Sequence, residues 1–356
     1  MSTRSPDPIY LRASVANQCN QNCCYCPKKE GMENRVPAAL AGQKLTSEEY
    51  VQNLEHIARN GIRGVSITGG EPTLNRDLPR IVEAAAGIFE RVELTSNGFA
   101  LLRMLPSLAP SLDLLKISVD TADPYVNASI TNGKVTDLQR AMDCVTEACR
   151  LGLNVGINAV VMRSTLGGLD EVMTFARRTN ELGHSGQAYV SLLDFYYSPE
   201  RREIWEREFV PIGHLADDFE ERFGARGIQD RFGCTFFWFD AEGVEVRFKD
   251  SLGATHRAPK CRRCPHYCQE GIYGLKHSVE GWVTSCPNGE PSLGALLAPG
   301  LRPEEADALL APLIRDIADA VSDRTSFSQM VKTHGLHPDL TLDRTESTTT
   351  GLRVLP

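Results

Sequence analysis

The sequence predicts an α/β protein in which a partial (β/α)6 barrel of the TIM type precedes a smaller C-terminal part made of hairpins and a helix. From residue 10 to about residue 197, short β-branched runs alternate with amphipathic helical stretches. Strict alternation with buried strands implies a parallel sheet with right-handed crossovers, and six such units form an incomplete barrel. The distinctive motifs of this region each follow a predicted strand, where the loops of a barrel carry its chemistry.

The helix at residues 45–62 has the clearest local signal of the predicted elements. Thr46 and Glu49 form a capping box ahead of apolar residues at helical spacing. In chain order we expect strands at residues 10–15, 64–68, 92–96, 114–120, 154–162 and 188–195, and further helices at 80–89, 136–151 and 169–182.

The pattern changes after residue 198. Residues 199–207 are mostly charged and polar and predict a linker, followed by a helix around residues 215–223. Hairpins are expected at residues 235–248 and 273–286, and a last helix at 303–321. The predicted domains are a barrel at 1–198, a linker and hairpin domain at 199–300, a C-terminal helix region at 301–340 and a disordered tail at 341–356.

Composition and charge exclude several classes of protein. A chain of 356 residues with 42% hydrophobic and 24% charged residues is typical of a soluble globular protein. The formal net charge of −8 argues against a general nucleic-acid or anionic-membrane binder, since the surface repels phosphate. No apolar run reaches membrane-spanning length and no signal-peptide core is present, so we expect a cytoplasmic protein without nucleic-acid or membrane partners.

The cysteines fall mainly in two groups that indicate metal centres. Eleven cysteines in a chain with no export signal do not indicate disulfides. The first group is Cys19, Cys23, Cys24 and Cys26, and the second is Cys261, Cys264, Cys268 and Cys286.

The first group has the spacing Cys-x3-Cys-x2-Cys, with Cys24 between the second and third thiols. Three thiolates can hold three irons of a [4Fe–4S] cluster and leave the fourth iron open, whereas a structural zinc site takes four closed ligands. The alternative, cysteines packed as small apolar residues, fits this polar loop poorly. With Tyr25 before the last cysteine, the stretch resembles the signature of the radical S-adenosylmethionine (radical SAM) superfamily.

That resemblance implies a chemistry and a set of ligands. In the superfamily, SAM chelates the open iron, and an electron from the cluster cleaves SAM to methionine and a 5′-deoxyadenosyl radical that abstracts hydrogen from substrate. By resemblance, Cys19, Cys23 and Cys26 ligate the cluster and Tyr25 helps to place SAM. The cofactor carries the difficult chemistry, and the protein positions it and excludes water.

Three further motifs follow the second, third and fourth strands. Gly69, Gly70 and Glu71, in Thr-Gly-Gly-Glu-Pro, resemble the element whose glycine backbone meets the methionine amino group of SAM; taken alone, they form an ordinary turn. Thr95 opens Thr-Ser-Asn-Gly, which resembles the next loop, reaching SAM or substrate; the alternative is a plain turn. Ser118, in Ser-Val-Asp, resembles a serine that contacts SAM, against the alternative of a satisfied strand-end serine.

The second cysteine group, taken alone, favours zinc, because Cys-x2-Cys followed by a cysteine-bearing hairpin is typical of a zinc knuckle. The chain, however, resembles the GTP 3′,8-cyclase branch of the superfamily, whose C-terminal domain holds an auxiliary [4Fe–4S] cluster on three cysteines. Cys261, Cys264 and Cys286 match that pattern. Cys268 is additional, and a fourth thiolate would close the cluster and leave it an electron-transfer or structural role.

The substrate positions of those cyclases match only in part. Arg12 and Thr95 stand where the cyclases have an arginine and a threonine that contact GTP. Ser66, however, stands at an arginine position, Gly156 replaces a lysine, and a C-terminal Gly-Gly is absent. Each lost charge-assisted contact costs about 1.5–3 kcal/mol, so losing two or three weakens triphosphate binding by several orders of magnitude. The resemblance therefore implies the same catalytic apparatus with a different substrate.

We therefore expect a radical SAM enzyme that abstracts hydrogen from a small molecule, a nucleoside, sugar or amino-acid derivative, with flavodoxin or ferredoxin as electron donor. One alternative is a maturase of ribosomally made peptides, although the nine residues before the first strand leave no room for the usual precursor-binding module. A true GTP 3′,8-cyclase is a minor alternative. A non-enzymatic zinc or iron–sulfur scaffold is the last.

Overall fold

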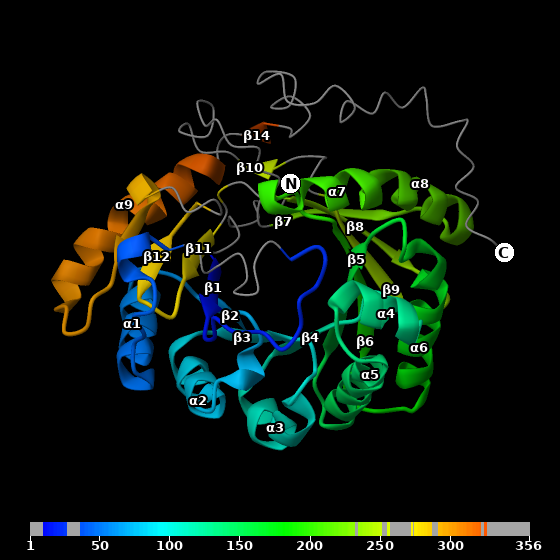
Figure 1. Ribbon diagram of the computed structural model, residues 1–356, viewed down its shortest axis with the longest axis horizontal. Helices are drawn as coiled ribbons and strands as arrows, with labels where there is room; N and C mark the ends of the chain where they lie inside the picture. Colours follow the sequence, from blue (N-terminus) through cyan, green and yellow to red (C-terminus); the bar gives the residue numbers. More distant parts are fainter. Residues whose placement is uncertain are drawn as a thin grey trace, which may run out of the picture.

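The computed structural model describes residues 10–26, 36–231, 234–250, 255–256, 272, 274–286, 291–321 and 324–325. Its centre is a sheet of twelve described strands, in the order β13-β12-β11-β1-β2-β3-β4-β5-β6-β9-β8-β7, which curves into an open arc (Figure 1). Helices line the outside of this arc. The predicted α/β class and partial barrel are confirmed.

The middle of the sheet is the predicted parallel barrel. Its strands are β1 (Tyr10–Ser14), β2 (Gly64–Thr68), β3 (Arg91–Ser96), β4 (Leu114–Ser118), β5 (Val155–Val161) and β6 (Ala188–Asp194), each parallel to the next. The helices are α1 (Ser47–Arg59), α2 (Leu78–Ile88), α3 (Leu101–Leu108), α4 (Pro124–Thr131), α5 (Val135–Arg150) and α6 (Leu169–Glu181). Every predicted barrel element is present, with its ends within three residues of the prediction.

Local capping explains where two of these helices begin. The capping box of α1 is confirmed: Glu49 N donates to Thr46 Oγ1 at 3.3 Å, and Thr46 N donates to the Glu49 carboxylate at 2.7 Å. The sequence prediction missed α3 and α4, which have eight residues each. In α4, Asp123 caps the N-terminus and Pro124 occupies the first turn, a favourable start that the weak apolar periodicity hides.

Both edges of the sheet are extended by later parts of the chain. On one side β9 (Glu245–Asp250) pairs in parallel with β6, followed by β8 (Cys234–Asp240) and β7 (Gly227–Arg231). On the other, β11 (Gly274–His277) pairs in parallel with β1, followed by β12 (Trp282–Thr284) and β13 (Gly294–Leu296). The two predicted hairpins therefore form, and they continue the barrel sheet.

One predicted linker is in fact helical. After the short turn Pro199–Arg201, residues of the expected linker form α7 (Arg202–Glu208), because Trp205 is buried and stacks on Phe209 with ring centroids 4.4 Å apart. The other C-terminal elements are α8 (Ile212–Phe223), α9 (Pro303–Val321) and a small pair, β10 (Thr255–His256) with β14 (Arg324–Thr325). The predicted tail at 341–356 lies outside the described residues.

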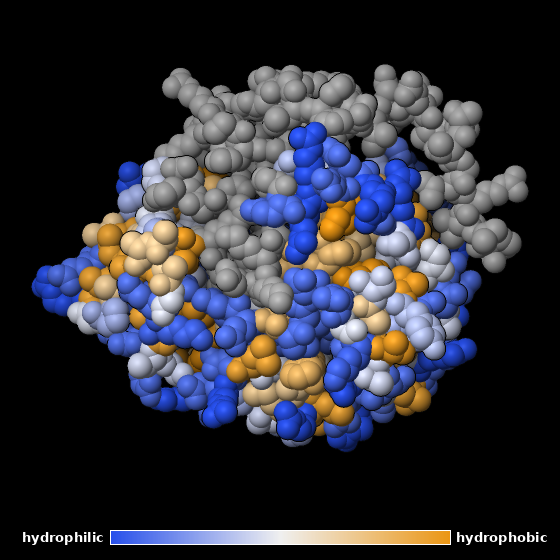
Figure 2. Space-filling view, in the orientation of Figure 1, coloured by the Kyte–Doolittle hydropathy of each residue, from blue (hydrophilic) through white to orange (hydrophobic). Residues whose placement is uncertain are grey.

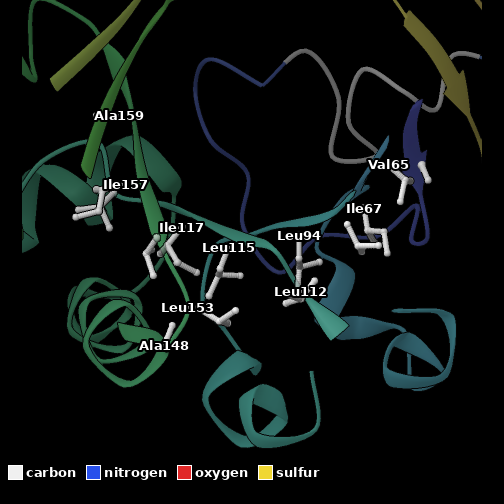
Figure 3. Close-up of a cluster of buried hydrophobic side chains, with 14 of the residues drawn as sticks. Val65, Ile67, Leu94, Leu112, Leu115, Ile117, Ala148, Leu153, Ile157 and Ala159 are labelled. Carbon is white, nitrogen blue, oxygen red and sulfur yellow. The ribbon is translucent and has the colours of Figure 1, made fainter. Parts of the chain in front are cut away.

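The core lies between the sheet and its helices (Figure 3). Val65, Ile67, Leu94, Leu115 and Ile117 are fully buried there. Because alternate residues of a strand point to opposite faces, the residues between them face the inside of the arc. Along β6 the outer-facing residues are buried and the inner-facing ones half-buried, so the inner side of this strand is partly accessible to solvent.

The surface carries no obvious single apolar region on the face that Figure 2 shows, where hydrophilic and hydrophobic residues are interspersed. Large exposed hydrophobic side chains sit on separate elements, such as Tyr125 on α4 and Leu182 after α6. Among the described helices, none combines the length and apolar character needed to cross a bilayer.

Candidate active site

The cysteine loop, residues 15–26, leaves the end of β1 and is fastened first to the glycine turn after β2. Gly70 N donates to Ala16 O at 2.7 Å, and Glu71 N donates to Gln18 O at 2.7 Å. These two backbone bonds fix the loop immediately before its first cysteine.

The two glycines of that turn are required by this close approach. Gly69 has a φ of +145°, and a Cβ there would lie 2.5 Å from the carbonyl oxygen of Ala16. A Cβ on Gly70 would overlap the carbonyl oxygen of Gln18. The sequence predicted that glycines let backbone approach a ligand; the structure shows that they also let the turn approach the cysteine loop.

Glu71 joins the loop after β2 to the loop after β3. Its side chain is 1% exposed, and Oε1 accepts from Thr73 N at 3.0 Å, Thr73 Oγ1 at 2.7 Å and Ser96 Oγ at 2.7 Å. Oε2 accepts from Asn97 N at 2.8 Å. Burial raises the pKa of Glu71, and these hydrogen bonds lower it. Both carboxylate oxygens of Glu71 accept hydrogen bonds from the protein itself. Its predicted role in placing SAM would therefore be indirect, through the two loops that it holds together.

The other side of the cysteine loop rests on the end of α4. Asn22 N donates to Thr131 O at 2.9 Å, and Cys24 N donates to Ile130 O at 2.8 Å. Cys24 also packs against an apolar cluster, which comprises Ile130, Met162, Phe195, Trp205 and Phe209. Cys24, to which the sequence analysis gave no ligand role, is therefore the cysteine of this loop that packs against apolar side chains.

Tyr25 is held by an aspartate that the sequence analysis did not assign to the site. The Tyr25 hydroxyl donates to Asp120 Oδ2 at 2.8 Å, and Val160 N donates to Asp120 Oδ1 at 2.9 Å. Asp120 is 3% exposed, and burial raises its pKa to about 6. The sequence could have pointed to Asp120, because it is the last residue of the Ser-Val-Asp motif. This motif begins at Ser118, the last residue of β4.

Cys19, Cys23 and Cys26 form no disulfide, and all three are half-buried within this one loop. Cys19 Sγ has two N–H donors, Gln21 N at 3.4 Å and Asn97 Nδ2 at 3.7 Å. Burial raises the pKa of both Cys19 and Cys23, so bound iron is needed to favour their thiolates. Soft sulfur donors supplied with N–H groups are the donor set of an iron–sulfur cluster.

Within the described ranges, no three His, Cys, Asp or Glu side chains come close enough to hold a single metal ion. A cubane cluster does not require this, because each thiolate binds a different iron. The three-cysteine loop therefore fits the predicted [4Fe–4S] cluster.

A polar pocket with room for about one water molecule lies between the cysteine loop, the ends of β3 and β4, and the helices α4 and α5. Its lining includes Tyr25, Asn97, Ser118 and Asp120, together with Gln21 of the cysteine loop. The structure thus brings together residues from three motifs that the sequence assigned to SAM. Their individual roles remain predictions.

The two predicted substrate contacts lie on the inner face of the sheet. Arg12 on β1 and Thr95 on β3 are half-buried, and each alternates with buried neighbours such as Leu11 and Leu94. Both side chains therefore face the inside of the arc, in agreement with a substrate role that stays a prediction.

The second cysteine group is described only at Cys286. Its thiol is buried at the end of β12, whereas Cys261, Cys264 and Cys268 lie outside the described residues. The hairpin that carries Cys286 is attached directly to the cysteine loop, because Asn17 Nδ2 donates to Glu280 Oε1 at 2.6 Å. This contact joins the turn of the hairpin to the cysteine loop, beside the pairing of β11 with β1.

This chain is similar to known proteins both in sequence and in fold. Residues 13–176 match the Radical SAM superfamily model. A probable GTP 3′,8-cyclase of Methanococcus aeolicus is 34% identical over 260 residues, which cover 71% of this chain and 80% of that protein. The chain belongs to the radical SAM superfamily. A GTP 3′,8-cyclase of Lactiplantibacillus plantarum is 33% identical over 287 residues, 78% of each chain.

Among solved structures, native anSMEcpe with bound AdoMet matches this radical SAM chain with a TM-score of 0.52 at 13% identity. The match covers 88% of this chain and 82% of that one, and it shows the shared fold. Membership of the superfamily confirms that the chain is an enzyme that uses a [4Fe–4S] cluster and SAM. The likeness to the cyclases supports the second predicted cluster.

Proposed function

We propose that this radical SAM enzyme abstracts a hydrogen atom from a small metabolite other than GTP, a nucleoside, sugar or amino-acid derivative. The observation that carries the proposal is that Tyr25, Asn97 and Ser118, which belong to three separate motifs, converge beside the cysteine loop. SAM bound beside these residues would supply the radical, and Arg12 and Thr95, half-buried on the inner face of the sheet, would contact the substrate.

The residues of the chain divide this work. Cys19, Cys23 and Cys26 would hold the cluster, which, once reduced with SAM bound, supplies the 5′-deoxyadenosyl radical. Ser118 and Tyr25 would contact SAM, with Asp120 orienting Tyr25 through the 2.8 Å hydrogen bond. The apolar cluster under Cys24 would exclude water from the outer side of the loop.

The C-terminal hairpins would form the auxiliary-cluster domain at residues 199–300. We assign its second [4Fe–4S] cluster to Cys261, Cys264, Cys268 and Cys286, with four thiolates closing it for an electron-transfer or structural role. A flavodoxin or ferredoxin would reduce the SAM-binding cluster. The contact between Asn17 and Glu280 would hold the hairpin that carries Cys286 in a fixed position relative to the cysteine loop.

The test is SAM cleavage by anaerobically reconstituted protein reduced with dithionite. We expect iron and sulfide in cluster stoichiometry, 5′-deoxyadenosine as product, and deuterium transfer into it from the correct labelled substrate. Replacing Cys23 with Ala should abolish cleavage, and replacing Cys24 with Ala is the matched control. Near-stoichiometric zinc without SAM cleavage would instead establish the scaffold.

A second candidate is GTP 3′,8-cyclase activity, which the 34% identity to a probable cyclase favours. Ser66 and Gly156 oppose it, because neither supplies the positive charge that a triphosphate needs. Incubation of the reduced enzyme with SAM and GTP decides whether it has GTP 3′,8-cyclase activity. Formation of the cyclised nucleotide at a rate matching 5′-deoxyadenosine release would replace the first proposal.

A further inference from the structure

A cleft of about 360 Å³ lies between the first residues of the cysteine loop and the N-terminal ends of α1 and α2. These two helices are neighbours on the outside of the arc (Figure 1). The described lining comes from the ranges 15–18, 44–50 and 74–81 and from Val279. It includes none of the residues predicted to bind SAM or substrate, so the cleft is separate from both. Its volume is that of a small-molecule site, roughly 300–1,000 Å³.

Two exposed cations border this cleft. Lys44 stands just before α1 and Arg76 just before α2. In the part of the chain that the structure describes, neither side chain takes part in a hydrogen bond or an ion pair. The acidic residue of the described lining is Asp77, whose Oδ2 accepts from Ser47 Oγ at 2.5 Å. The described lining therefore carries a net positive charge, which attracts an anion.

The two helix ends add to this attraction. α1 and α2 have 13 and 11 residues, and the N-terminus of a helix carries a partial positive charge. The N-terminus of α1 is closed by its capping box. Asp77, at the cap position of α2, makes no capping hydrogen bond with its side chain. The start of α2 therefore faces the cleft without a side-chain cap.

The deeper part of the cleft is apolar. Val15, Ile81 and Val279 are buried side chains of the lining. The amide of Asn75 is already engaged, because Nδ2 donates to Val15 O at 2.8 Å and Oδ1 accepts from Asp77 N at 2.9 Å. A ligand thus meets cations at the exposed edge and hydrocarbon further in. This arrangement favours a carboxylate on an apolar body over inorganic phosphate, which needs more hydrogen-bond donors.

The walls of the cleft belong to the two loops that form the candidate active site. Residues 15–18 lead directly into Cys19, and residues 74–77 follow the glycine turn and Glu71. The bond from Asn75 to Val15, with the two backbone bonds from the glycine turn, already joins these walls. A ligand that contacts both walls stabilises the same loop arrangement that SAM would require. Binding at the two sites is then coupled, and the coupling is reciprocal.

We propose that this cleft is an effector site for a small monocarboxylate with an apolar body, bound by Lys44 and Arg76, and that its occupancy strengthens SAM binding. The second part rests on the proposed function, because it takes SAM to bind beside the cysteine loop. The site differs in place from the predicted substrate contacts, Arg12 and Thr95, which lie on the inner face of the sheet.

The first experiment identifies the ligand class by calorimetry on the cluster-loaded enzyme with SAM present. The probe is benzoate, and the comparison compounds are benzamide, which lacks the charge, acetate, which lacks the ring, and inorganic phosphate. We expect benzoate to bind at least tenfold more tightly than each of the three. If benzamide, acetate or phosphate binds as tightly as benzoate, or if benzoate does not bind, the proposed ligand class is wrong.

The second experiment locates the site with two independent changes. Leu74→Glu places a carboxylate at a lining position that is 38% exposed, and Leu102→Glu, 44% exposed on α3, is its matched control. Lys44→Met combined with Arg76→Met removes both cations, and Arg103→Met, at an exposed position of α3, is the control for loss of charge. We expect Leu74→Glu and the double variant each to raise the dissociation constant of benzoate at least tenfold, and the controls to leave it unchanged. Unchanged binding in both would place the benzoate site elsewhere.

The third experiment measures the effect on SAM. We expect saturating benzoate to lower the dissociation constant of SAM at least threefold in the unaltered enzyme and to leave it unchanged in Leu74→Glu. By reciprocity, SAM should tighten benzoate binding by the same factor. SAM affinity that does not respond to benzoate would overturn the effector role. Absence of SAM cleavage from every preparation would overturn the proposed function instead, while benzoate binding still decides whether the cleft is an anion site.

Discussion

Two buried carboxylates organise the two ends of this barrel in opposite ways. Glu71, beside the cysteine loop, is surrounded by neutral N–H and O–H donors, and burial raises its pKa. Glu93, inside the arc, is surrounded by Lys116 and Arg91, and its pKa falls to about 2. Neutral donors fix the geometry of a loop, whereas the cations around Glu93 keep its carboxylate ionised in spite of burial. The comparison separates a carboxylate that holds two loops together from one that pairs with cations inside the sheet.

The largest effect is expected at the cysteine loop. Cys23→Ala should remove one iron ligand, because no other thiol can replace it while Cys24 packs against the apolar cluster. We expect loss of the iron-based absorbance that bleaches with dithionite and no detectable 5′-deoxyadenosine. Cys24→Ala should keep both signals, and its failure to do so would mean that Cys24 takes part in the cluster.

The next largest effect tests the glycine turn. Gly70→Ala forces a Cβ onto the carbonyl of Gln18, so we expect SAM cleavage to fall at least about 100-fold as the cysteine loop shifts. Gly87→Ala on α2 is the matched control, because nothing lies within 4 Å of its Cβ position. That change should leave cleavage intact and stabilise the helix by about 0.5–1 kcal/mol in a denaturant titration.

A smaller loss is expected from Glu71→Gln, which keeps the shape of the side chain. An amide has one acceptor oxygen, so it cannot serve the donors on both Oε1 and Oε2, and one of the loops after β2 and β3 is released. We expect SAM cleavage to fall about tenfold with a raised apparent Kd for SAM. An unchanged Kd for SAM would show that Glu71 does not position the loops that meet SAM.

The last and most gradual effect is a change in folding stability with pH, caused by the titration of Glu93. The folded-state pKa of Glu93 is about 2, below its ordinary value of 4.5, so its stabilisation is fully present above pH 4.5 and is lost as pH falls toward 2. We expect the protein to lose on the order of 3 kcal/mol across that window from this group. Urea unfolding at several pH values measures it, and Glu93→Gln should remove this part of the pH dependence. If the stability of Glu93→Gln depends on pH as strongly as that of the unaltered protein, a group other than Glu93 causes the effect.

The parts of the fold that local sequence determines were predictable. The capping box of Thr46 and Glu49 located α1, and the motif order located the cysteine loop and the glycine turn. By contrast, α7 looked like a linker because its residues are charged, and only the burial of Trp205 reveals that it packs against the barrel. Charged residues on one side of this short helix hide the few apolar contacts, those of Ile204 and Trp205, that hold it against the barrel.

Site residues that belong to a motif were predictable from the sequence. Residues whose place depends on which strands pair with each other were not. Ser118 and Tyr25 belong to motifs, and the structure brings them to one pocket. Val279 reaches the cleft beside the cysteine loop only because β11 pairs in parallel with β1, a long-range pairing that no local pattern records. The same holds for Ile130, whose carbonyl on an unpredicted helix supports the cysteine loop.

The pairing of β11 with β1 has a consequence for how this protein is made. Residues 274–277 complete the hydrogen-bonding edge of residues 10–13, so that edge stays unpaired until most of the chain has left the ribosome. Such distant pairings are slow to form and expose a nascent chain to misassembly. We therefore expect the first iron–sulfur centre to be installed after synthesis, once the last hairpin has closed over the strand that bears the cysteine loop.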